Sequence, residues 1–185
     1  MLSDFLKKSI KTDSIATQSE LKSSTIKLPV LIQRKMIISN NVYKKIMASY
    51  PTPPPEQGGI LGIRDGSICE YFHDASHGCA HQAVYEPDTE LLNRVIENWA
   101  DDEICFAGIV HSHIAGQETL SADDVEYINV IFNAMPENIT ELYFPIIIPE
   151  NSTLVSFSAQ RKNQNIIIST DDVQIINTKG GEKHD

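Results

Sequence analysis

The sequence has few cysteines and no long apolar segment, and each shortage excludes a class of protein. Three cysteines occur in 185 residues, at positions 69, 79 and 105. An odd number without paired spacing argues against a disulfide-stabilised secreted domain, and we expect Cys105, within an apolar run, to be a packed thiol. No run approaches the roughly 20 apolar residues of a membrane span, and the N-terminus lacks the apolar segment of a signal peptide. These absences predict a cytoplasmic protein with no membrane partner.

Basic residues are also scarce relative to acidic ones. The 15 Lys and Arg residues against 25 Asp and Glu residues give a net charge of −10, which disfavours nucleic acid as a partner and allows a basic protein surface. The length fits a single domain with a sizeable core. We expect a mobile N-terminal arm at residues 1–26, one domain at residues 27–177 and a loose polar tail at residues 178–185. The oligomeric state stays open.

Strand-like and helix-like segments are mixed along the chain, which predicts a mixed α/β (α+β) sheet with helices packed on it. Short β-branched runs, with a hairpin signal at Asp65-Gly66, predict strands at residues 28–32, 36–38, 58–64, 67–72, 104–111, 141–148, 153–159 and 165–170. Apolar stripes predict helices that begin near Ser39, Pro87-Asp88 and Ser121. The apolar face of the helix after Ser121 is expected to carry Val125, Ile128, Phe132 and Met135.

Two histidines directly follow the apolar run Ile104–Val110. Because residues i and i+2 of a strand share a face, His111 and His113 can reach one metal ion from a strand end. Asp124 falls in the first turn of the next predicted helix and can complete a site of two His and one carboxylate, which is how catalytic zinc is held. The same residues also fit a polar strand exit and a capping box with Ser121 as N-cap. The capping interpretation is compatible with a metal site because it orients Asp124.

A second segment upstream makes this pattern more specific. In order, the chain has Glu56, Gly58-Gly59-Ile60-Leu61-Gly62, His111-Ser112-His113, seven residues, Ser121, two residues and Asp124. This arrangement resembles the motif of the JAB/MPN metalloproteases, also called JAMM proteases, over about residues 30–160, and looks closest to their short prokaryotic members. The resemblance implies a cytidine-deaminase-like fold, in which helices flank a curved mixed sheet. Without the histidines, Glu56 would be taken for an ordinary loop glutamate.

The resemblance also implies a mechanism with one Zn²⁺ as cofactor. His111, His113 and Asp124 would hold the zinc, which activates a water molecule. Glu56 would serve as general base, and Ser121 would donate a hydrogen bond to the developing oxyanion. The expected enzyme is a zinc-dependent, deubiquitinase-like isopeptidase or peptidase. It would hydrolyse the amide bond after the C-terminal glycine of a ubiquitin-like protein, in deconjugation or in precursor processing.

Three alternatives stay open. The same chemistry would serve a small-molecule or sulfur-carrier conjugate. MPN relatives that lack the metal ligands are non-catalytic scaffolds, although here every ligand is present. The DNA-repair-associated branch of JAB relatives has Asn-His-Pro-Ser-Gly after its first His, whereas this chain has Ser112-His113-Ile114-Ala115-Gly116, and its acidic charge also disfavours that branch. The sequence names neither the substrate protein nor the pathway.

A second group of possible ligands consists of His73, His77, Cys79 and His81. Its spacing fits no established zinc pattern, so a polar loop is the better interpretation and a second zinc site the alternative. We also expect the loops at residues 74–81 and 114–120 to border the substrate groove, because they flank the predicted glutamate hairpin and the metal-binding strand.

Overall fold

The computed structural model describes residues 34–51, 55–75, 85, 87–163 and 165–177. The predicted N-terminal arm, the strand at residues 28–32 and the C-terminal tail lie outside these residues. Within them, the helices are α1 (Asn40–Ser49), α2 (Thr89–Asp101) and α3 (Ala122–Ala134). The strands are β1 (Lys35–Ser39), β2 (Gly58–Arg64), β3 (Ser67–Asp74), β4 (Cys105–Ser112), β5 (Glu141–Tyr143), β6 (Ile146–Ile148), β7 (Thr153–Lys162) and β8 (Asn165–Ile176).

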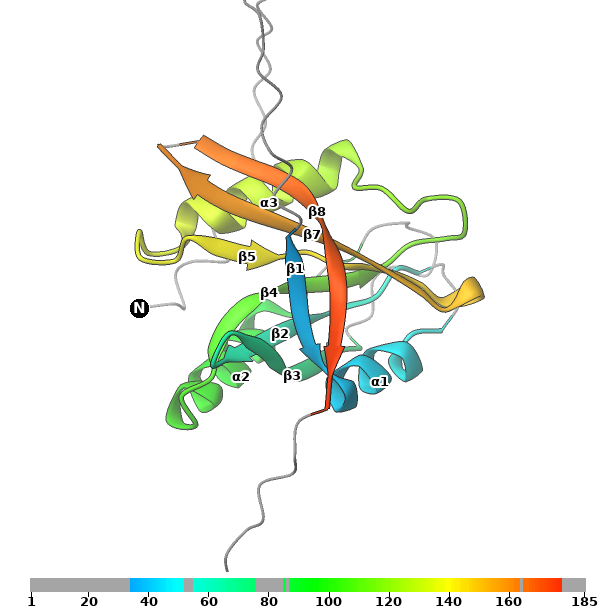
Figure 1. Cartoon of the computed structure of the whole chain (residues 1–185), viewed down its shortest axis with the longest axis horizontal. Helices are drawn as coiled ribbons and strands as arrows, with labels where there is room; N and C mark the ends of the chain where they lie inside the picture. Colours follow the sequence, from blue (N-terminus) through cyan, green and yellow to red (C-terminus); the bar gives the residue numbers. More distant parts are fainter. Residues whose placement is uncertain (1–33, 52–54, 76–84, 86, 164, 178–185) are drawn as a thin grey trace, which may run out of the picture.

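All of these strands belong to one strongly curved sheet (Figure 1). Its strand order is β2-β3-β1-β8-β7-β5-β4-β6, and the order closes on itself because β2 also pairs with β4. Parallel pairs, such as β1–β8 and β4–β6, occur beside antiparallel pairs, such as β2–β3 and β7–β8. The mixed α/β sheet flanked by helices confirms the predicted fold class.

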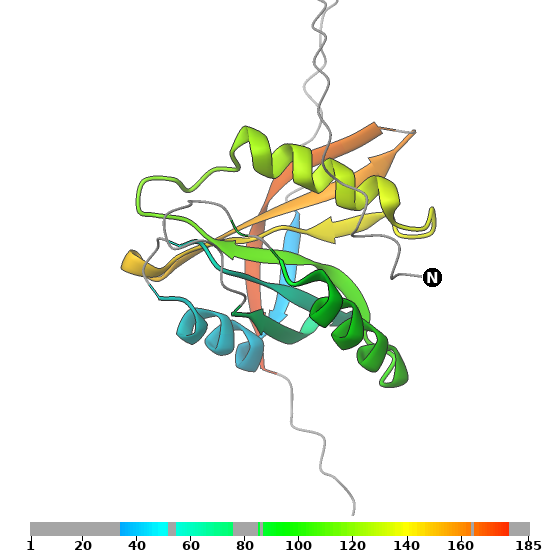
Figure 2. The same cartoon turned by 180° about the vertical axis from the view of Figure 1, so that it is seen from behind.

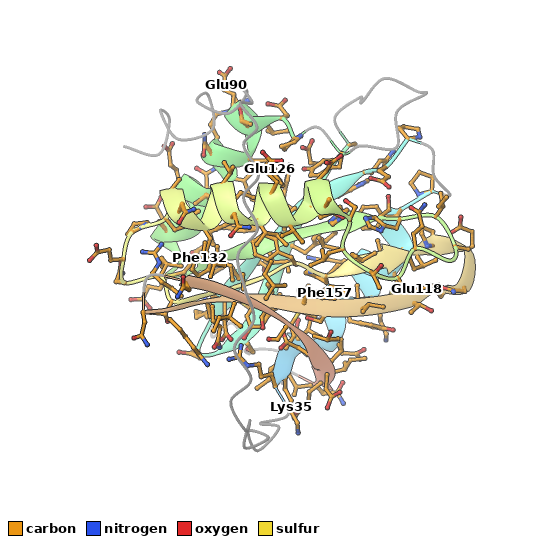
Figure 3. The ribbon with its side chains drawn as sticks, turned by 90° about the horizontal axis from the view of Figure 1, so that it is seen from above. Lys35, Glu90, Glu118, Glu126, Phe132 and Phe157 are labelled. Carbon is orange, nitrogen blue, oxygen red and sulfur yellow. The ribbon has the colours of Figure 1, made fainter. Side chains whose placement is uncertain are left out.

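Apolar residues form a core on each face of the sheet. Neighbouring residues of β2 enter different cores, since Ile60 belongs to the cluster of α2 and α3 whereas Leu61 belongs to that of α1. Such alternation is what the pleat of a strand requires. Figure 2 shows α2 and α3 in front of the sheet. Phe132 of α3, labelled in Figure 3, is fully buried in the cluster of these helices. The face of β4 that carries Ile109 therefore looks toward α3.

Each helix begins where the sequence indicated. The Ser39 hydroxyl accepts a hydrogen bond from the backbone N–H of Val42 at 3.3 Å, and the Asp88 carboxylate accepts one from Leu91 at 3.0 Å. These caps satisfy N–H groups that have no partner inside the helix. None of the helices in the described residues has both the length and the apolar character needed to cross a membrane.

The predicted strand at residues 141–148 is wrong in one respect, because it is divided into β5 and β6. Pro145 lies at the break and has no N–H to donate to a neighbouring strand. Its carbonyl instead accepts a hydrogen bond from the backbone N–H of His111 at 3.2 Å. The last two strands also run further than predicted, to Lys162 and Ile176.

Two side chains differ from their predicted burial. Val125 is 37% exposed, and Ile131 takes its place on the buried face of α3. That face also carries Asp124, one turn before Ile128, so Val125 is turned toward the margin of the helix. Cys105 is exposed rather than packed because it opens β4 at the rim of the sheet.

Candidate metal centre and active site

The end of β4 brings the two predicted histidine ligands together. His111 lies within the strand and His113 directly after it, and both are buried. Their ring centroids are 4.6 Å apart, and their Nε2 atoms are 2.8 Å apart. The i and i+2 spacing therefore places both imidazoles on one side of the strand, as predicted.

The first turn of α3 places the third predicted ligand against this pair. Ser121 Oγ accepts the N–H of Asp124 at 3.1 Å, and the Asp124 carboxylate accepts the N–H of Ser121 at 2.6 Å. This capping box confirms the predicted cap and fixes the side chain of Asp124. Its two oxygens lie 3.1 Å from His111 Nε2 and 3.5 Å from His113 Nε2.

These three side chains offer the kinds of donor atom that hold zinc. Ligand atoms at about 2.0–2.2 Å from a tetrahedral zinc lie roughly 3.3–3.6 Å from one another. The separation of 3.5 Å is inside this range, and those of 2.8 and 3.1 Å are somewhat shorter, so the side chains would move slightly apart to seat an ion. His113 Nδ1 is 2.8 Å from the carbonyl oxygen of Gln117, which can only accept, so Nδ1 donates this hydrogen bond and Nε2 is the ring nitrogen that faces His111 and Asp124. Within the described part of the chain, this is the one group of His, Cys, Asp and Glu with metal-site spacing.

The electrostatics of the group favour positive charge at its centre. Burial by itself raises the pKa of Asp124, but hydrogen bonds from His111 and His113 outweigh it and hold the pKa well below the usual range. Burial lowers the pKa of His113, but the Asp124 carboxylate and the Gln117 carbonyl outweigh it and raise the pKa overall. A charged carboxylate thus faces two imidazoles, a combination that stabilises a proton or a metal cation.

Glu56 lies across from this group because β2 pairs with β4. Gly58 is paired with His111 in antiparallel register, so the chain before β2 runs beside His113. The Glu56 side chain is buried, and this burial raises its pKa to about 7, while His113 lowers it and Asp124 raises it. A glutamate of this kind can both take and return a proton near neutral pH.

Ser112, between the two histidines, holds the glutamate segment in place. Its hydroxyl accepts the N–H of Gln57 at 3.0 Å, and its own N–H donates to the Gln57 carbonyl at 2.8 Å. Sequence reasoning assigned no role to Ser112. Side chains alternate along a strand, so Ser112 lies on the face opposite to that of His111 and His113. This alternation is the sequence feature that could have assigned Ser112 a supporting role.

The second group of possible ligands is only partly described. His73 lies in β3, where its Nε2 is 3.0 Å from the amide oxygen of Gln57 and its ring packs edge-on against Tyr50. Burial lowers the pKa of His73, against the raising effect of Asp74. His77, Cys79 and His81 lie outside the described residues, so the predicted second zinc site and its polar-loop alternative both stay predictions.

One pocket contains all five predicted site residues. Its volume is about 400 Å³, and Glu56, Ser121 and the three metal-ligand candidates contribute to its lining. The Ser121 hydroxyl accepts from Asp124 and retains its own proton for donation. Gln117, from the loop that also carries Glu118 (Figure 3), reaches the pocket too, as do Tyr85 and Tyr127, which sequence reasoning missed. Tyr127 follows Asp124 by three positions on α3, a spacing that could have revealed it.

Neither protein-family models nor curated proteins match the chain. Among solved structures, the chain is similar to the crystal structure of a JAB1/MPN domain protein from Archaeoglobus fulgidus, with 18% sequence identity and a TM-score of 0.42. The match covers 77% of this chain and all of the archaeal chain, 100%. Likeness at this level assigns no activity.

Proposed function

We propose that the protein is a zinc metalloprotease of the JAMM type that hydrolyses the amide bond after the C-terminal glycine of a ubiquitin-like protein. The observation that carries the proposal is the convergence of His111, His113 and Asp124, with buried Glu56 in the same pocket. A structural polar cluster needs no cavity, whereas these groups surround a space that admits a substrate.

The side chains divide the chemistry of amide hydrolysis among them. When bound, zinc supplies a Lewis acid and a water molecule of lowered pKa. Glu56 takes the proton of the attacking water and returns it to the leaving amine, for which a raised pKa is suited. The Ser121 hydroxyl donates a hydrogen bond to the oxygen on which negative charge develops.

The surrounding contacts keep these groups in position. The Gln117 carbonyl fixes the orientation and tautomer of His113. Ser112 fixes Gln57 and, through it, the adjacent Glu56. Catalytic groups need such support because displacement by about 1 Å can cost roughly 100-fold in rate.

The ubiquitin-like substrate class follows from the motif resemblance. A C-terminal tail that ends in glycines is thin and extended, so it can approach the pocket as an added strand. The loop at residues 114–120, which contributes Gln117, is one expected border of that path. The net charge of −10 is compatible with a basic partner surface.

The direct test uses a ubiquitin-like protein that ends in glycine, fused through its C-terminal glycine to a reporter. We expect zinc-dependent cleavage that a chelator abolishes, with mass spectrometry placing the cut after that glycine. Elemental analysis should find about one zinc per chain in the wild type and little in His113→Ala. Chelator-insensitive cleavage, or equal zinc in both proteins, contradicts the proposal. Cleavage of a small sulfur-carrier conjugate alone would favour the alternative substrate.

A further inference from the structure

The pocket continues from the metal-ligand group into an apolar recess. Ile109 precedes His111 by two positions on the same face of β4, and Ile128 follows Asp124 by one turn of α3. On both β4 and α3, the side chains that line the pocket therefore change from metal-ligand candidates to isoleucines. The apolar residues that line the pocket are Tyr85, Ile109, Tyr127, Ile128 and Phe144.

The floor of this recess is part of the protein core. Ile109, Ile128 and Phe144 are at most 6% exposed and belong to one buried cluster. Close-packed core residues do not rearrange readily to fill a neighbouring space. The recess is thus preformed, in a pocket whose 400 Å³ lies within the roughly 300–1,000 Å³ typical of small-molecule sites.

The Tyr85 ring forms a fixed wall of the recess. Its hydroxyl donates a hydrogen bond of 2.8 Å to the carboxylate of Asp74, which is fully buried and also accepts the N–H of Asp88 at 2.8 Å. The ring lies directly on Gly58, where an added Cβ would come within 2.3 Å of it. Gly58 pairs with His111, so Tyr85 is held one strand away from the metal-ligand group.

We propose that this recess is a specificity subsite for an apolar side chain on the residue that follows the scissile amide, with Tyr85 as its specificity-determining wall. The inference rests on the proposed function, because it names the substrate chemistry of the same site. Two glycines carry no side chain to fill the recess, whereas a leucine or phenylalanine removes apolar surface from water there.

The test keeps glycine before the scissile amide of the reporter fusion and varies the residue directly after it among Gly, Ala, Leu and Phe. At this position, Leu or Phe should raise kcat/KM by about tenfold or more over Gly, the scale of selection in an apolar pocket. If glycine is preferred at this position, the subsite is refuted although the protease remains.

A binding measurement separates the subsite from the activity. Calorimetry with zinc-loaded Glu56→Gln and short peptides that contain Leu or Gly at the varied position requires no turnover. About tenfold tighter binding of the Leu peptide supports the recess even if no fusion is cleaved, a result that would refute only the proposed function. Equal affinities refute the recess.

Tyr85 variants test the wall itself. In Tyr85→Ala, the Leu-over-Gly preference should fall to within about threefold. Tyr85→Phe keeps the ring but loses the bond to Asp74, so an intermediate preference is expected. Tyr143→Phe is the matched control, because its hydroxyl donates to Glu141 away from the pocket, and it should keep the wild-type preference. An unchanged preference in both Tyr85 variants would overturn the assignment.

Discussion

Asp124, on α3, and Asp171, on β8, are aspartates with limited exposure, and their pKa values shift in opposite directions. Two imidazoles face Asp124, and their hydrogen bonds overcome the effect of burial and lower its pKa. Burial raises the pKa of Asp171, and the hydrogen bond from Ser158 at 2.9 Å only partly opposes it. Burial alone therefore does not mark a functional carboxylate, whereas the kind of partner does.

The surroundings of the two residues differ in the same way. Asp124 borders a cavity, together with side chains that offer lone pairs to a cation. Asp171 belongs to a polar network in the sheet, where Arg34 pairs with Glu141 and hydrogen-bonds Gln160. In that network Ser158 hydrogen-bonds one carboxylate oxygen of Asp171, whereas the other oxygen is buried without a hydrogen-bond partner among the described residues, so this aspartate is only partly satisfied.

The largest expected difference between the two aspartates concerns zinc. Asp124→Asn removes a charged ligand, so we expect loss of most bound zinc and of activity. Asp171→Asn should retain about one zinc per chain, because Asp171 does not line the pocket. Elemental analysis after dialysis measures both, and similar zinc contents in the two variants would show that Asp124 is not a ligand.

Glu56→Gln should separate catalysis from metal binding. We expect at least about a 100-fold loss of kcat, as for a removed general base, with normal zinc content and an unchanged circular dichroism spectrum. The substitution preserves size and leaves His111, His113 and Asp124 intact. Near-normal turnover of the reporter fusion would mean that another group accepts the proton.

The parts of the site that depend on local spacing were predictable from the sequence. His111 and His113 share a strand face through their two-residue spacing, and Ser121 and Asp124 form a capping box through their three-residue spacing. By contrast, Glu56 is joined to the histidines by the pairing of β2 with β4. Its segment is 55 positions from Ser112, and only the motif resemblance indicated that they meet.

The features that sequence reasoning missed depend on tertiary packing. No periodicity relates Tyr85 to Asp74 or Gly58, because the contact joins a loop to two strands. The prediction for Val125 followed helical periodicity, but the contact with the metal-ligand group decided which face of α3 turns inward. The burial of Cys105 was mispredicted for a similar reason. Its neighbours in the sequence are apolar, but they do not indicate that the residue lies at the end of a strand, where it is exposed.

Ser121→Ala should have a smaller effect on rate than Glu56→Gln and a measurable effect on stability. It removes a helix cap, about 1 kcal/mol, and a proposed oxyanion donor, for which we expect at least about a tenfold loss of kcat. Ser39→Ala is the matched control, because Ser39 caps α1 outside the pocket. We expect Ser39→Ala to lose a similar amount of stability but no kcat. Equal kcat values in the two variants would mean that Ser121 acts only as a helix cap.

The smallest expected effect is the pH dependence that Asp171 gives to stability. Because its folded pKa is raised, its contribution is fully present below the unfolded pKa of about 3.9 and is lost as pH rises through the folded pKa. Asp171→Asn should therefore gain stability relative to the wild type as pH rises from about 4 toward neutrality, within about 1 kcal/mol. Urea unfolding of both proteins across this range measures the difference, with the exposed neighbour Asp172→Asn as control. A pH-independent difference would mean that Asp171 is charged in the folded protein as readily as in the unfolded chain, and that its contrast with Asp124 is one of degree.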